Sequence, residues 1–303
     1  MKILITGATN GIGKGVAKVL ASQSDPNNEI IILCRSEKLG KETIKEIEGK
    51  TSTNKHSIVQ CDLSKLSDVK KAIAEIHKNH EFLDAIFINA GLGYAAKRVE
   101  TKDGFDSHFQ VNYLSQFMLS LNLLSLLDKS EIGGQIIFNA TKTKKEKIVW
   151  DDLQMKDKWT FESGIFQAMI AKRMFLNKLH RLHREKHNSK LSFVGFQVSK
   201  TVWSNQINMI PSFMRFIATT MKFFGSFISI EECGKIMLPL FTANQNDKLN
   251  RSGKLITWKK NQFTEITEDP TVLNLEMQDK LWNISLDLCD DEQTRQIAEK
   301  LEN

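Results

Sequence analysis

Short apolar runs alternate along this chain with longer stretches in which apolar residues recur at helical spacing, as Ile12, Val16 and Leu20 do. The short runs are continuously apolar, which is typical of strands buried on both faces of a sheet. The alternation therefore predicts an α/β fold, a doubly wound parallel sheet with helices on both faces. Seven strands are predicted, at Lys2–Thr6, Glu29–Cys34, Ser57–Cys61, Ala85–Asn89, Gln135–Ala140, Leu191–Val198 and Lys254–Trp258.

The chain shows no internal repeat, low-complexity tract or Pro/Ser-rich linker, so residues 1–303 are predicted to form a single domain. The main shift in composition is a Met/Phe-rich stretch, interpreted as a lid-like segment at about residues 207–230 rather than a domain boundary. A hydrophobic substrate cover and a contact with a protein partner fit this stretch equally well. A membrane-surface contact is a third alternative.

The net charge of +6 and the pI near 9.0 would attract nucleic acid, anionic lipid or phosphorylated ligands. Lys and Arg are scattered and little interleaved with aromatic residues, so nucleic-acid binding is not expected. The chain opens with a predicted strand where a targeting segment would lie, and Arg215 and Lys222 interrupt its longest apolar stretch. No transmembrane segment is expected. A cytoplasmic location is predicted, with an organelle such as the mitochondrion left open.

Neither the cysteines nor the histidines predict a metal site. The four cysteines lie far apart in the sequence and fit neither a disulfide framework nor paired metal ligands, so they are predicted to be reduced core residues. His180, His183 and His187 fall on one side of a predicted helix among basic residues, which favours a solvated basic face over a metal centre.

Glycines cluster directly after the first predicted strand, where the chain reads Thr6-Gly7-Ala8-Thr9-Asn10-Gly11-Ile12-Gly13 and opens the first helix. Glycine there lets the chain turn tightly and lets backbone N–H groups approach a pyrophosphate, whose charge the helix N-terminus favours. The context of strand, turn and helix predicts a dinucleotide site in a Rossmann-type fold. The alternative is a Gly-rich turn without a ligand.

The residue after the second strand bears on the choice between NAD and NADP. An acidic residue there hydrogen-bonds the ribose 2′-hydroxyl and repels a 2′-phosphate. This chain has Arg35 instead, and a guanidinium can bind a phosphate in a bidentate manner. Arg35 therefore predicts NADP(H) in preference to NAD(H), with an exposed arginine at the start of a helix as the alternative.

These motifs resemble those of the short-chain dehydrogenase/reductase family, whose nucleotide fingerprint is TGxxxGIG. Cys61-Asp62-Leu63 resembles the adenine-contacting loop of the family, Asn89-Ala90-Gly91 its NAG motif, and Val111-Asn112 its helix asparagine. Segments as far as Leu281-Trp282-Asn283-Ile284-Ser285 look like the retinol-dehydrogenase-like branch, which acts on lipophilic carbonyl/alcohol pairs with NADP(H). The resemblance implies that the cofactor is bound by Thr6, Gly7, Thr9, Asn10, Gly11, Ile12, Gly13, Arg35, Asp62, Leu63, Asn89, Ala90, Gly91, Lys172 and Thr201.

The family resemblance also implies a catalytic tetrad of Asn, Ser, Tyr and Lys, of which this chain retains only part. Asn112 is present, and Thr141 stands where the family has its serine, with a hydroxyl that can still hold a carbonyl. The YxxxK motif reads Ala168-Met169-Ile170-Ala171-Lys172, so Ala168 replaces the tyrosine that donates the proton. Lys172 is expected to bind ribose, with an ordinary lysine on the helix surface as the alternative.

The whole chain has two tyrosines, Tyr94 and Tyr113, so no small shift of the alignment restores the motif. Tyr94 follows Asn89-Ala90-Gly91 in a loop that the family places near the nicotinamide, and it is the candidate substitute. The Pro-Gly turn that the family has after its sixth strand is also missing here, where the chain reads Ser199-Lys200-Thr201.

Two functions are compatible with these residues. The first is an NADP(H)-binding protein that is weakly active or non-catalytic and acts as a structural, assembly or sensing component, with protein partners or a second copy of itself. The second is an NADPH-dependent oxidoreductase that reduces a lipophilic carbonyl, such as a retinoid, steroid or lipid. It would use Thr141 to hold the carbonyl and Tyr94 or water as the proton source. Loss of a general acid typically costs about 10²- to 10⁴-fold in rate, which favours the first.

Overall fold

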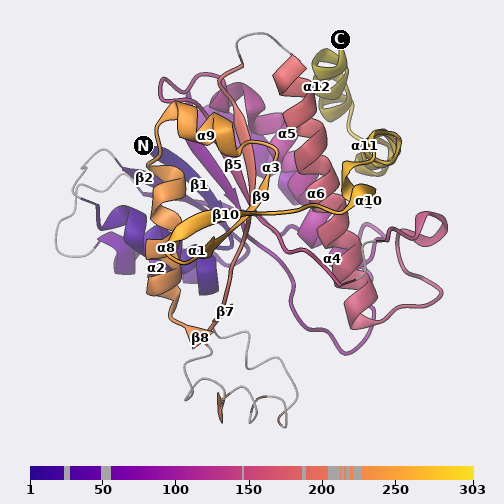
Figure 1. Cartoon of the computed structure of the whole chain (residues 1–303), viewed down its shortest axis with the longest axis horizontal. Helices are drawn as coiled ribbons and strands as arrows, with labels where there is room; N and C mark the ends of the chain where they lie inside the picture. Colours follow the sequence, from indigo (N-terminus) through magenta and orange to yellow (C-terminus); the bar gives the residue numbers. More distant parts are fainter. Residues whose placement is uncertain are drawn as a thin grey trace.

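The computed structural model describes residues 1–23, 28–48, 56–144, 147–185, 189–203 and 227–303, and four single positions between 212 and 220. Eight strands form one sheet in the order β10-β9-β6-β5-β4-β1-β2-β3, and only β9 and β10 pair antiparallel (Figure 1). The strands are β1 (Lys2–Thr6), β2 (Glu29–Cys34), β3 (Ser57–Gln60), β4 (Ala85–Ile88), β5 (Gln135–Asn139), β6 (Ser192–Gln197), β9 (Leu255–Lys259) and β10 (Gln262–Ile266). The predicted doubly wound sheet is confirmed.

β1 lies at the point where the strand order reverses. It pairs with β2 on one side and with β4 on the other, both in parallel. In open α/β sheets ligands bind at such a switch point, in the crevice outside the carboxyl ends of the strands. The loops that follow β1 and β4 therefore border the expected site.

The prediction of seven strands is wrong by one. All seven predicted strands are present, with ends within one residue of those expected, and β10 is the eighth. It follows β9 through Lys260 and Asn261, whose φ angles of 50° and 59° belong to a tight hairpin turn. Because β10 is a partly exposed edge strand, it lacks the continuous apolar run that marks the buried strands.

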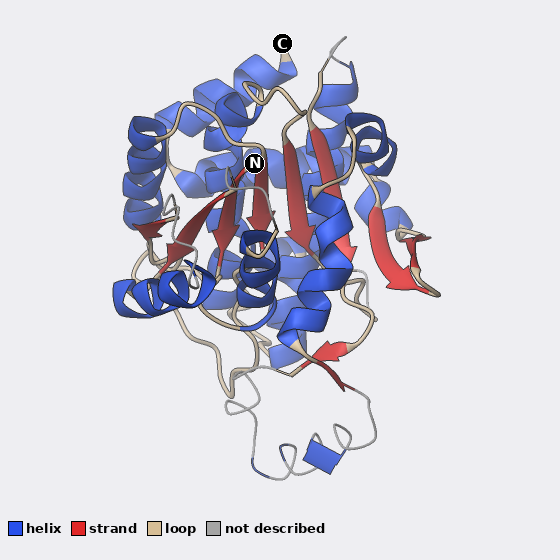
Figure 2. Cartoon of the chain, turned by 90° about the vertical axis from the view of Figure 1, so that its left-hand side faces the viewer, coloured by secondary structure: helices blue, strands red, loops and turns tan. Residues whose placement is uncertain are grey.

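Helices cover both faces of the sheet (Figure 2). One face carries α1 (Gly11–Ala21), α2 (Glu37–Glu48) and α8 (Ile230–Phe241). The other face carries α3 (Leu66–Asn79), α4 (Ser107–Phe109), α5 (Ser115–Leu127), α6 (Phe161–Glu185), α10 (Pro270–Leu273), α11 (Leu275–Cys289) and α12 (Glu292–Glu302). The short α9 (Gln245–Arg251) packs near β6, and a 3₁₀ turn (Trp150–Asp152) precedes α6.

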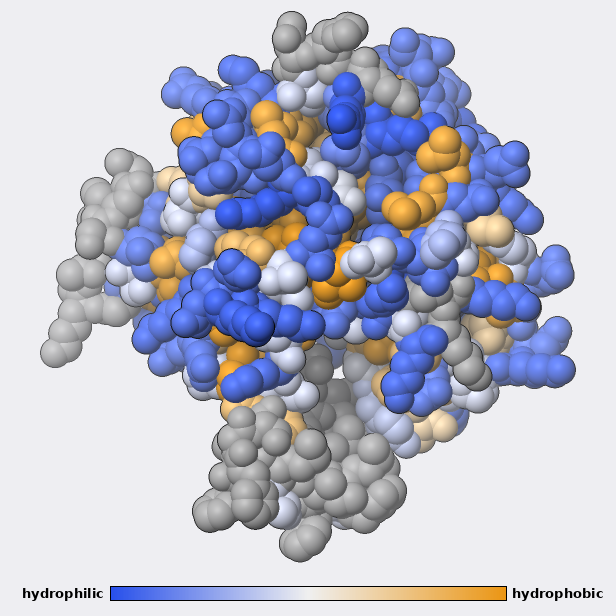
Figure 3. Space-filling view, in the orientation of Figure 1, coloured by the Kyte–Doolittle hydropathy of each residue, from blue (hydrophilic) through white to orange (hydrophobic). Residues whose placement is uncertain are grey.

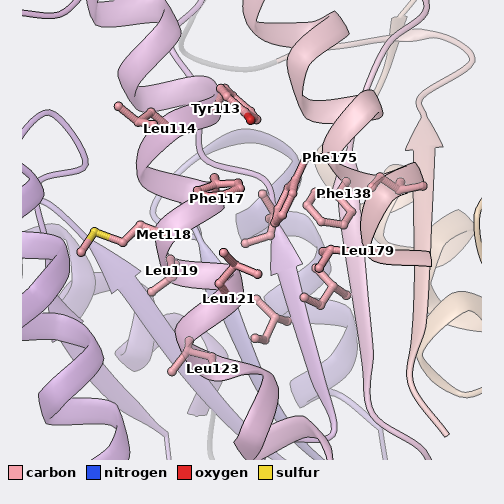
Figure 4. Packing of buried hydrophobic residues seen from close by; sticks show 14 of the residues in the cluster. Tyr113, Leu114, Phe117, Met118, Leu119, Leu121, Leu123, Phe138, Phe175 and Leu179 are labelled. Carbon is pink, nitrogen blue, oxygen red and sulfur yellow. The ribbon is translucent and has the colours of Figure 1, made fainter. Parts of the chain in front are cut away.

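The core is built from alternate side chains of the strands. In β4, Ala85 and Phe87 join the cluster under α1 and α8, whereas Ile86 and Ile88 join the cluster under α5 and α6. This alternation follows from the two-residue period of a strand. Figure 4 shows the larger cluster between α5, β5 and α6, where aromatic rings such as Phe117, Phe138 and Phe175 pack together.

A second, two-stranded sheet lies beyond the carboxyl ends of the central strands (Figure 2). It consists of β7 (Thr201–Val202) and β8 (Phe227–Ile228), which pair in parallel. Most of the predicted lid-like segment at 207–230 lies outside the described residues, and its last residues form β8 and begin α8.

The described surface is mostly polar. In the face seen in Figure 3, hydrophobic residues form several separate groups among hydrophilic ones. None of the helices built from described residues is long and apolar enough to cross a bilayer.

Candidate functional site

The glycine-rich turn wraps around the amino end of α1. Gly7 has a φ of 71°, a left-handed conformation that side chains disfavour. A Cβ at Gly13 would lie 2.6 Å from both the Gly7 carbonyl oxygen and Asn89 Nδ2, so the chain is packed too closely there for a side chain. Asn10 caps α1 by accepting from Gly11 N at 2.8 Å, and the first turn has no acidic residue. This helix end fits a pyrophosphate.

Thr6 and Asn89 tie this turn to the end of β4. Thr6 Oγ1 accepts hydrogen bonds from the backbone N–H groups of Asn89 and Ala90, each at 2.9 Å. Asn89 Nδ2 donates back to the Thr6 carbonyl at 3.1 Å. A Cβ at Gly7 would lie 2.9 Å from the Cα of Ala90. The structure thus brings these predicted cofactor residues together at the switch point, and the half-buried Thr9 and Ile12 flank them.

A π-helical turn (Gln110–Leu114) joins α4 to α5 and carries Asn112. Asn112 is wholly buried, accepts from Leu92 N at 2.6 Å and donates to the Leu92 carbonyl at 3.2 Å. Gln116 Nε2 donates to the Ala90 carbonyl at 2.5 Å. Turns of this kind are rare and frequently lie at functional sites. Here the turn fixes the loop that contains Gly91, whose Cβ would approach the Asn112 side chain.

A hollow of about 330 Å³ lies beside the carboxyl ends of β2 and β3. Among the described residues the exposed Arg35 guanidinium has no ion pair, whereas Lys65 and Lys71 lie 3.7 and 4.0 Å from Asp68. Among the described residues, Arg35 is therefore the cation of this hollow without a carboxylate partner. It lies where the 2′-phosphate of NADP(H) would need a positive charge. Its lining residues are Arg35, Gln60, Asp62, Lys65, Asp68 and Lys71.

The loop after β3 is internally braced. Asp62 Oδ1 accepts from Ser64 N at 3.1 Å and from Ser64 Oγ at 2.8 Å. Leu63 places its side chain in the core, and its carbonyl accepts from Ser115 Oγ at 2.6 Å. The carboxylate of Asp62 and the backbone of Leu63 are thus held at the rim of the hollow next to Arg35.

Two of the residues predicted for catalysis, Thr141 and Lys172, lie near the carboxyl end of β5. Thr141 follows this strand, is exposed, and its hydroxyl has no hydrogen bond within the described part of the chain. Lys172 of α6 is only 2% exposed, and its Nζ donates to the Asn139 carbonyl at 3.3 Å. Burial lowers the pKa of Lys172 to about 7. The alternative that Lys172 is a surface lysine is wrong.

Ala168 lies one helical turn before Lys172 and is wholly buried. Tyr113 lies in the core, where its hydroxyl shares a 2.7 Å hydrogen bond with Ser285 Oγ, and burial raises its pKa (Figure 4). Tyr94 lies half-buried in the loop after β4, with its ring 5.2 Å from that of Phe161, the first residue of α6. Of the two tyrosines, only Tyr94 borders the site.

Asn139 is a site residue that the motifs did not reveal. Its Nδ2 donates to Asn89 Oδ1 at 3.1 Å, and its carbonyl accepts from Lys172. Asn89 in turn contacts Thr6 and Gly7, so hydrogen bonds connect the glycine-rich turn to Lys172. The available signal was a polar residue directly after the apolar run Ile136-Ile137-Phe138.

Thr201 lies in β7, beyond the end of β6, and is exposed; nothing further in the structure bears on its predicted role. All four cysteines are free and buried, as predicted. The prediction of a solvated histidine face is wrong where it can be checked: His183 is buried against Phe193, and His180 contacts Ser252. The two imidazole rings point toward the protein interior because this side of α6 packs against β6 and the loop before β9. His187 lies outside the described residues.

Residues 1–150 match the family model described as short chain dehydrogenase. Polyprenol dehydrogenase from Homo sapiens is 28% identical over 183 residues, which are 59% of this chain and 54% of that protein. Retinol dehydrogenase 13 from Homo sapiens is 29% identical over 180 residues, covering 59% and 53%. These matches span about half the length of each relative.

Solved structures share the fold over nearly the whole chain. An uncharacterised protein from Mycobacterium paratuberculosis superposes with a TM-score of 0.67 at 18% identity, covering 96% of this chain and 94% of the other. An NADPH-bound carbonyl reductase from chicken fatty liver superposes with a TM-score of 0.58 at 18% identity, covering 85% and 96%. The match of residues 1–150 to the family model and the similarity to polyprenol and retinol dehydrogenases show that the chain belongs to the short-chain dehydrogenase/reductase family, on its retinol-dehydrogenase-like branch.

Proposed function

We propose that this protein binds NADP(H) in preference to NAD(H), and that it is a weakly active or non-catalytic member of its family. The preference is supported by Arg35, which has no ion pair among the described residues and lines the hollow beside the carboxyl ends of β2 and β3. The pyrophosphate is assigned to the turn of Gly7 to Gly13 at the end of α1. Such a cofactor supplies or accepts a hydride when bound.

The observation that carries the proposal is Ala168. A methyl group stands where the family has its proton donor, and that methyl group is wholly buried. Tyr113 cannot take over because its hydroxyl is committed to Ser285 inside the core. A protein with a complete nucleotide site and no tyrosine acid is suited to a structural, assembly or sensing role, with a protein partner or a second copy of the chain.

A second candidate function is the reduction of a lipophilic carbonyl. It is supported by the exposed hydroxyl of Thr141, which has no hydrogen bond among the described residues and can hold a carbonyl oxygen. Thr141 lies two positions after Asn139, whose carbonyl accepts from the buried amine of Lys172. The relatives named polyprenol dehydrogenase and retinol dehydrogenase point to the same class of substrate.

The test is cofactor titration followed by turnover. Purified protein is titrated with NADPH and NADH by fluorescence, and carbonyl reduction is then measured with aldehydes and ketones of increasing chain length. The wild-type protein is expected to bind NADPH more tightly than NADH and to turn over slowly. Ala168→Tyr is expected to raise the turnover rate by about 10²-fold or more, because it restores a general acid.

Ala168→Phe is the matched control, since it adds the same ring without the hydroxyl and is expected to give no gain. Both variants are compared with wild type in thermal unfolding and NADPH binding, which detects a failure to accommodate the ring. A wild-type rate that reaches the ordinary enzyme range, about 1 s⁻¹ or above, would contradict the proposal without reference to any variant.

A further inference from the structure

Lys172 has an unusual setting for a buried lysine. Its Nζ has one hydrogen-bond partner within the described part of the chain, the Asn139 carbonyl at 3.3 Å. An ammonium group has three donors, and a buried one is nearly always paired with a carboxylate. Here no carboxylate from the described residues pairs with it, so two N–H donors are available to a ligand at the end of β5.

Other buried cations of the same helix are paired. Arg173 forms an ion pair with Glu268 at 2.5 Å, and Lys178 lies 2.7 Å from both Asp279 and Glu302. The lack of a carboxylate partner for Lys172 among the described residues is therefore not a general property of α6. The missing carboxylate partner is specific to the face of α6 that lies toward β5.

Titratable groups on the elements around Lys172 are engaged elsewhere. His108 of α4 contacts the Gly93 carbonyl, and Tyr113 of the π-helical turn contacts Ser285. Glu268, before α10, pairs with Arg173. Burial is accordingly the cause that lowers the pKa of Lys172 to about 7. Three further charged groups on the neighbouring elements also have partners: Asp269 with Thr271 N, Asp279 with Lys178 and Arg181, and Lys142 with the Thr267 carbonyl.

The Lys172 amine lies near two other residues of the predicted catalytic site, Thr141 after β5 and Ala168 on α6. Thr141 is two residues beyond Asn139, whose carbonyl holds Lys172, and two residues span at most about 7 Å. Ala168, one turn earlier on α6, contributes only a methyl group. We propose that Lys172 itself is the proton donor, delivering a proton from its ammonium group to the oxygen of a carbonyl held by Thr141. This inference rests on the proposed NADP(H) site and accounts for the weak activity.

The reaction balances with NADPH as the reductant. The carbonyl carbon accepts a hydride from the bound cofactor, and the electron pair of the C=O π bond moves to oxygen. One N–H bond of Lys172 breaks as the O–H bond of the alcohol forms. The carbonyl is reduced, the cofactor is oxidised to NADP⁺, and Lys172 is left as a neutral amine that takes its next proton from solvent.

The direction of the pH dependence follows from these roles. Reduction requires the protonated amine, so its rate is expected to fall as pH rises through about 7. Oxidation of the alcohol requires the neutral amine, so its rate is expected to rise over the same range. Mirror-image profiles from wild-type protein alone support the proposal, and a reduction rate that stays constant between pH 6 and about 9 overturns it.

Two variants test the residue directly. Lys172→Arg keeps a positive charge that does not titrate below about pH 12, and Lys172→Met removes the charge. Lys172→Arg is expected to lower the reduction rate at saturating NADPH by about 10²-fold, whatever its effect on NADPH affinity. Exposed Lys78, changed to Arg, is the matched control and is expected to leave the rate unchanged. A Lys172→Arg rate within threefold of wild type, or loss of the rate in Tyr94→Phe, overturns the proposal.

The pH dependence of protein stability tests the proposal without any measurement of turnover. An unfolded lysine keeps its proton to about pH 10.4, so between pH 7 and 8.5 the unfolded state holds more protons and wild-type stability should rise with pH. The buried cysteines, whose pKa values are raised by burial, change the pH dependence of stability only above about pH 8.5. Lys172→Met should lack this rise, and an equal rise in both proteins overturns the proposal. Failure to bind NADPH would instead refute the proposed function, and NADPH binding with no turnover would refute only the role of Lys172.

Discussion

We propose that Arg35 determines the choice between NADP(H) and NAD(H). Lys65 and Lys71 share the hollow with it, but each is within 4.0 Å of Asp68, which neutralises part of their charge. Arg35 keeps its guanidinium free of carboxylates within the described part of the chain, and its planar fork suits a phosphate. We therefore propose that this single side chain after β2 distinguishes the two cofactors, which differ in one phosphate.

Arg35→Ala is expected to weaken NADPH binding by about 10- to 100-fold, because a charge-assisted hydrogen bond contributes about 1.5–3 kcal/mol. NADH affinity should stay within about twofold, since the 2′-hydroxyl does not need a cation. Fluorescence titration with both cofactors measures the change, and exposed Lys78→Ala serves as the control. Equal weakening of both cofactors would show that Arg35 does not contact the 2′-phosphate.

At the scale of elements, α1 depends on a helix from the far end of the chain. A Cβ at Gly15 would lie 1.9 Å from the Ile230 carbonyl oxygen, and a Cβ at Gly234 would lie 2.4 Å from the Gly15 carbonyl oxygen. The backbones of α1 and α8 therefore touch directly. Since α8 begins just after β8, the phosphate-binding helix is held by the element that follows the Met/Phe-rich segment.

Gly15→Ala is expected to destabilise the protein by about 1–3 kcal/mol or more, because neither backbone can move away without losing helix hydrogen bonds. Urea denaturation measures the loss. Lys18→Ala on the same helix removes only a surface ion pair with Glu46 and should cost at most about 1 kcal/mol. If Gly15→Ala unfolds at the same urea concentration as wild type, the close contact between α1 and α8 is not rigid.

These elements also show which structural features the sequence pattern predicts and which it does not. The strands of the parallel sheet and the turn from Gly7 to Gly13 were predictable, because burial on both faces and phosphate binding each need a local pattern of residues. Gly15 has no such pattern. Its requirement for glycine comes from Ile230, more than 200 positions away in the chain, and only the folded structure shows it.

At the scale of the whole molecule, the C-terminal helices cover α5. Nearly every side chain of this helix is buried, which is typical of a helix enclosed by protein on all sides. α3 and α12 pack against it, and Asn122 of α5 donates to Thr294 Oγ1 of α12 at 2.8 Å. Lys178 holds α11 and α12 to α6 through Asp279 and Glu302. The C-terminal helices thus close the apolar face of the domain.

Ala298→Asp is expected to detach α12, because it places an unpaired charge at a position that is wholly buried. The exposed apolar surface of α5 should then cause self-association, visible by light scattering, and should lower the free energy of unfolding by several kcal/mol, on the order of 3. Gln293→Asp introduces the same charge at an exposed position of α12 and should leave both quantities unchanged. Unaltered stability in Ala298→Asp would mean that α12 is dispensable.

The sequence by itself determined the α/β fold and the glycine-rich turn, placed Arg35 after the second strand, and predicted that Ala168 stands where the family has its tyrosine. Each of these is a local signal, readable from periodicity or from a short motif. Only the tertiary structure decided that Tyr113 is enclosed in the core, that Lys172 is buried beside Asn139 with no carboxylate partner from the described residues, and that α12 covers α5. Burial and pairing depend on residues distant in the chain, and for that reason they appear only when the chain is folded.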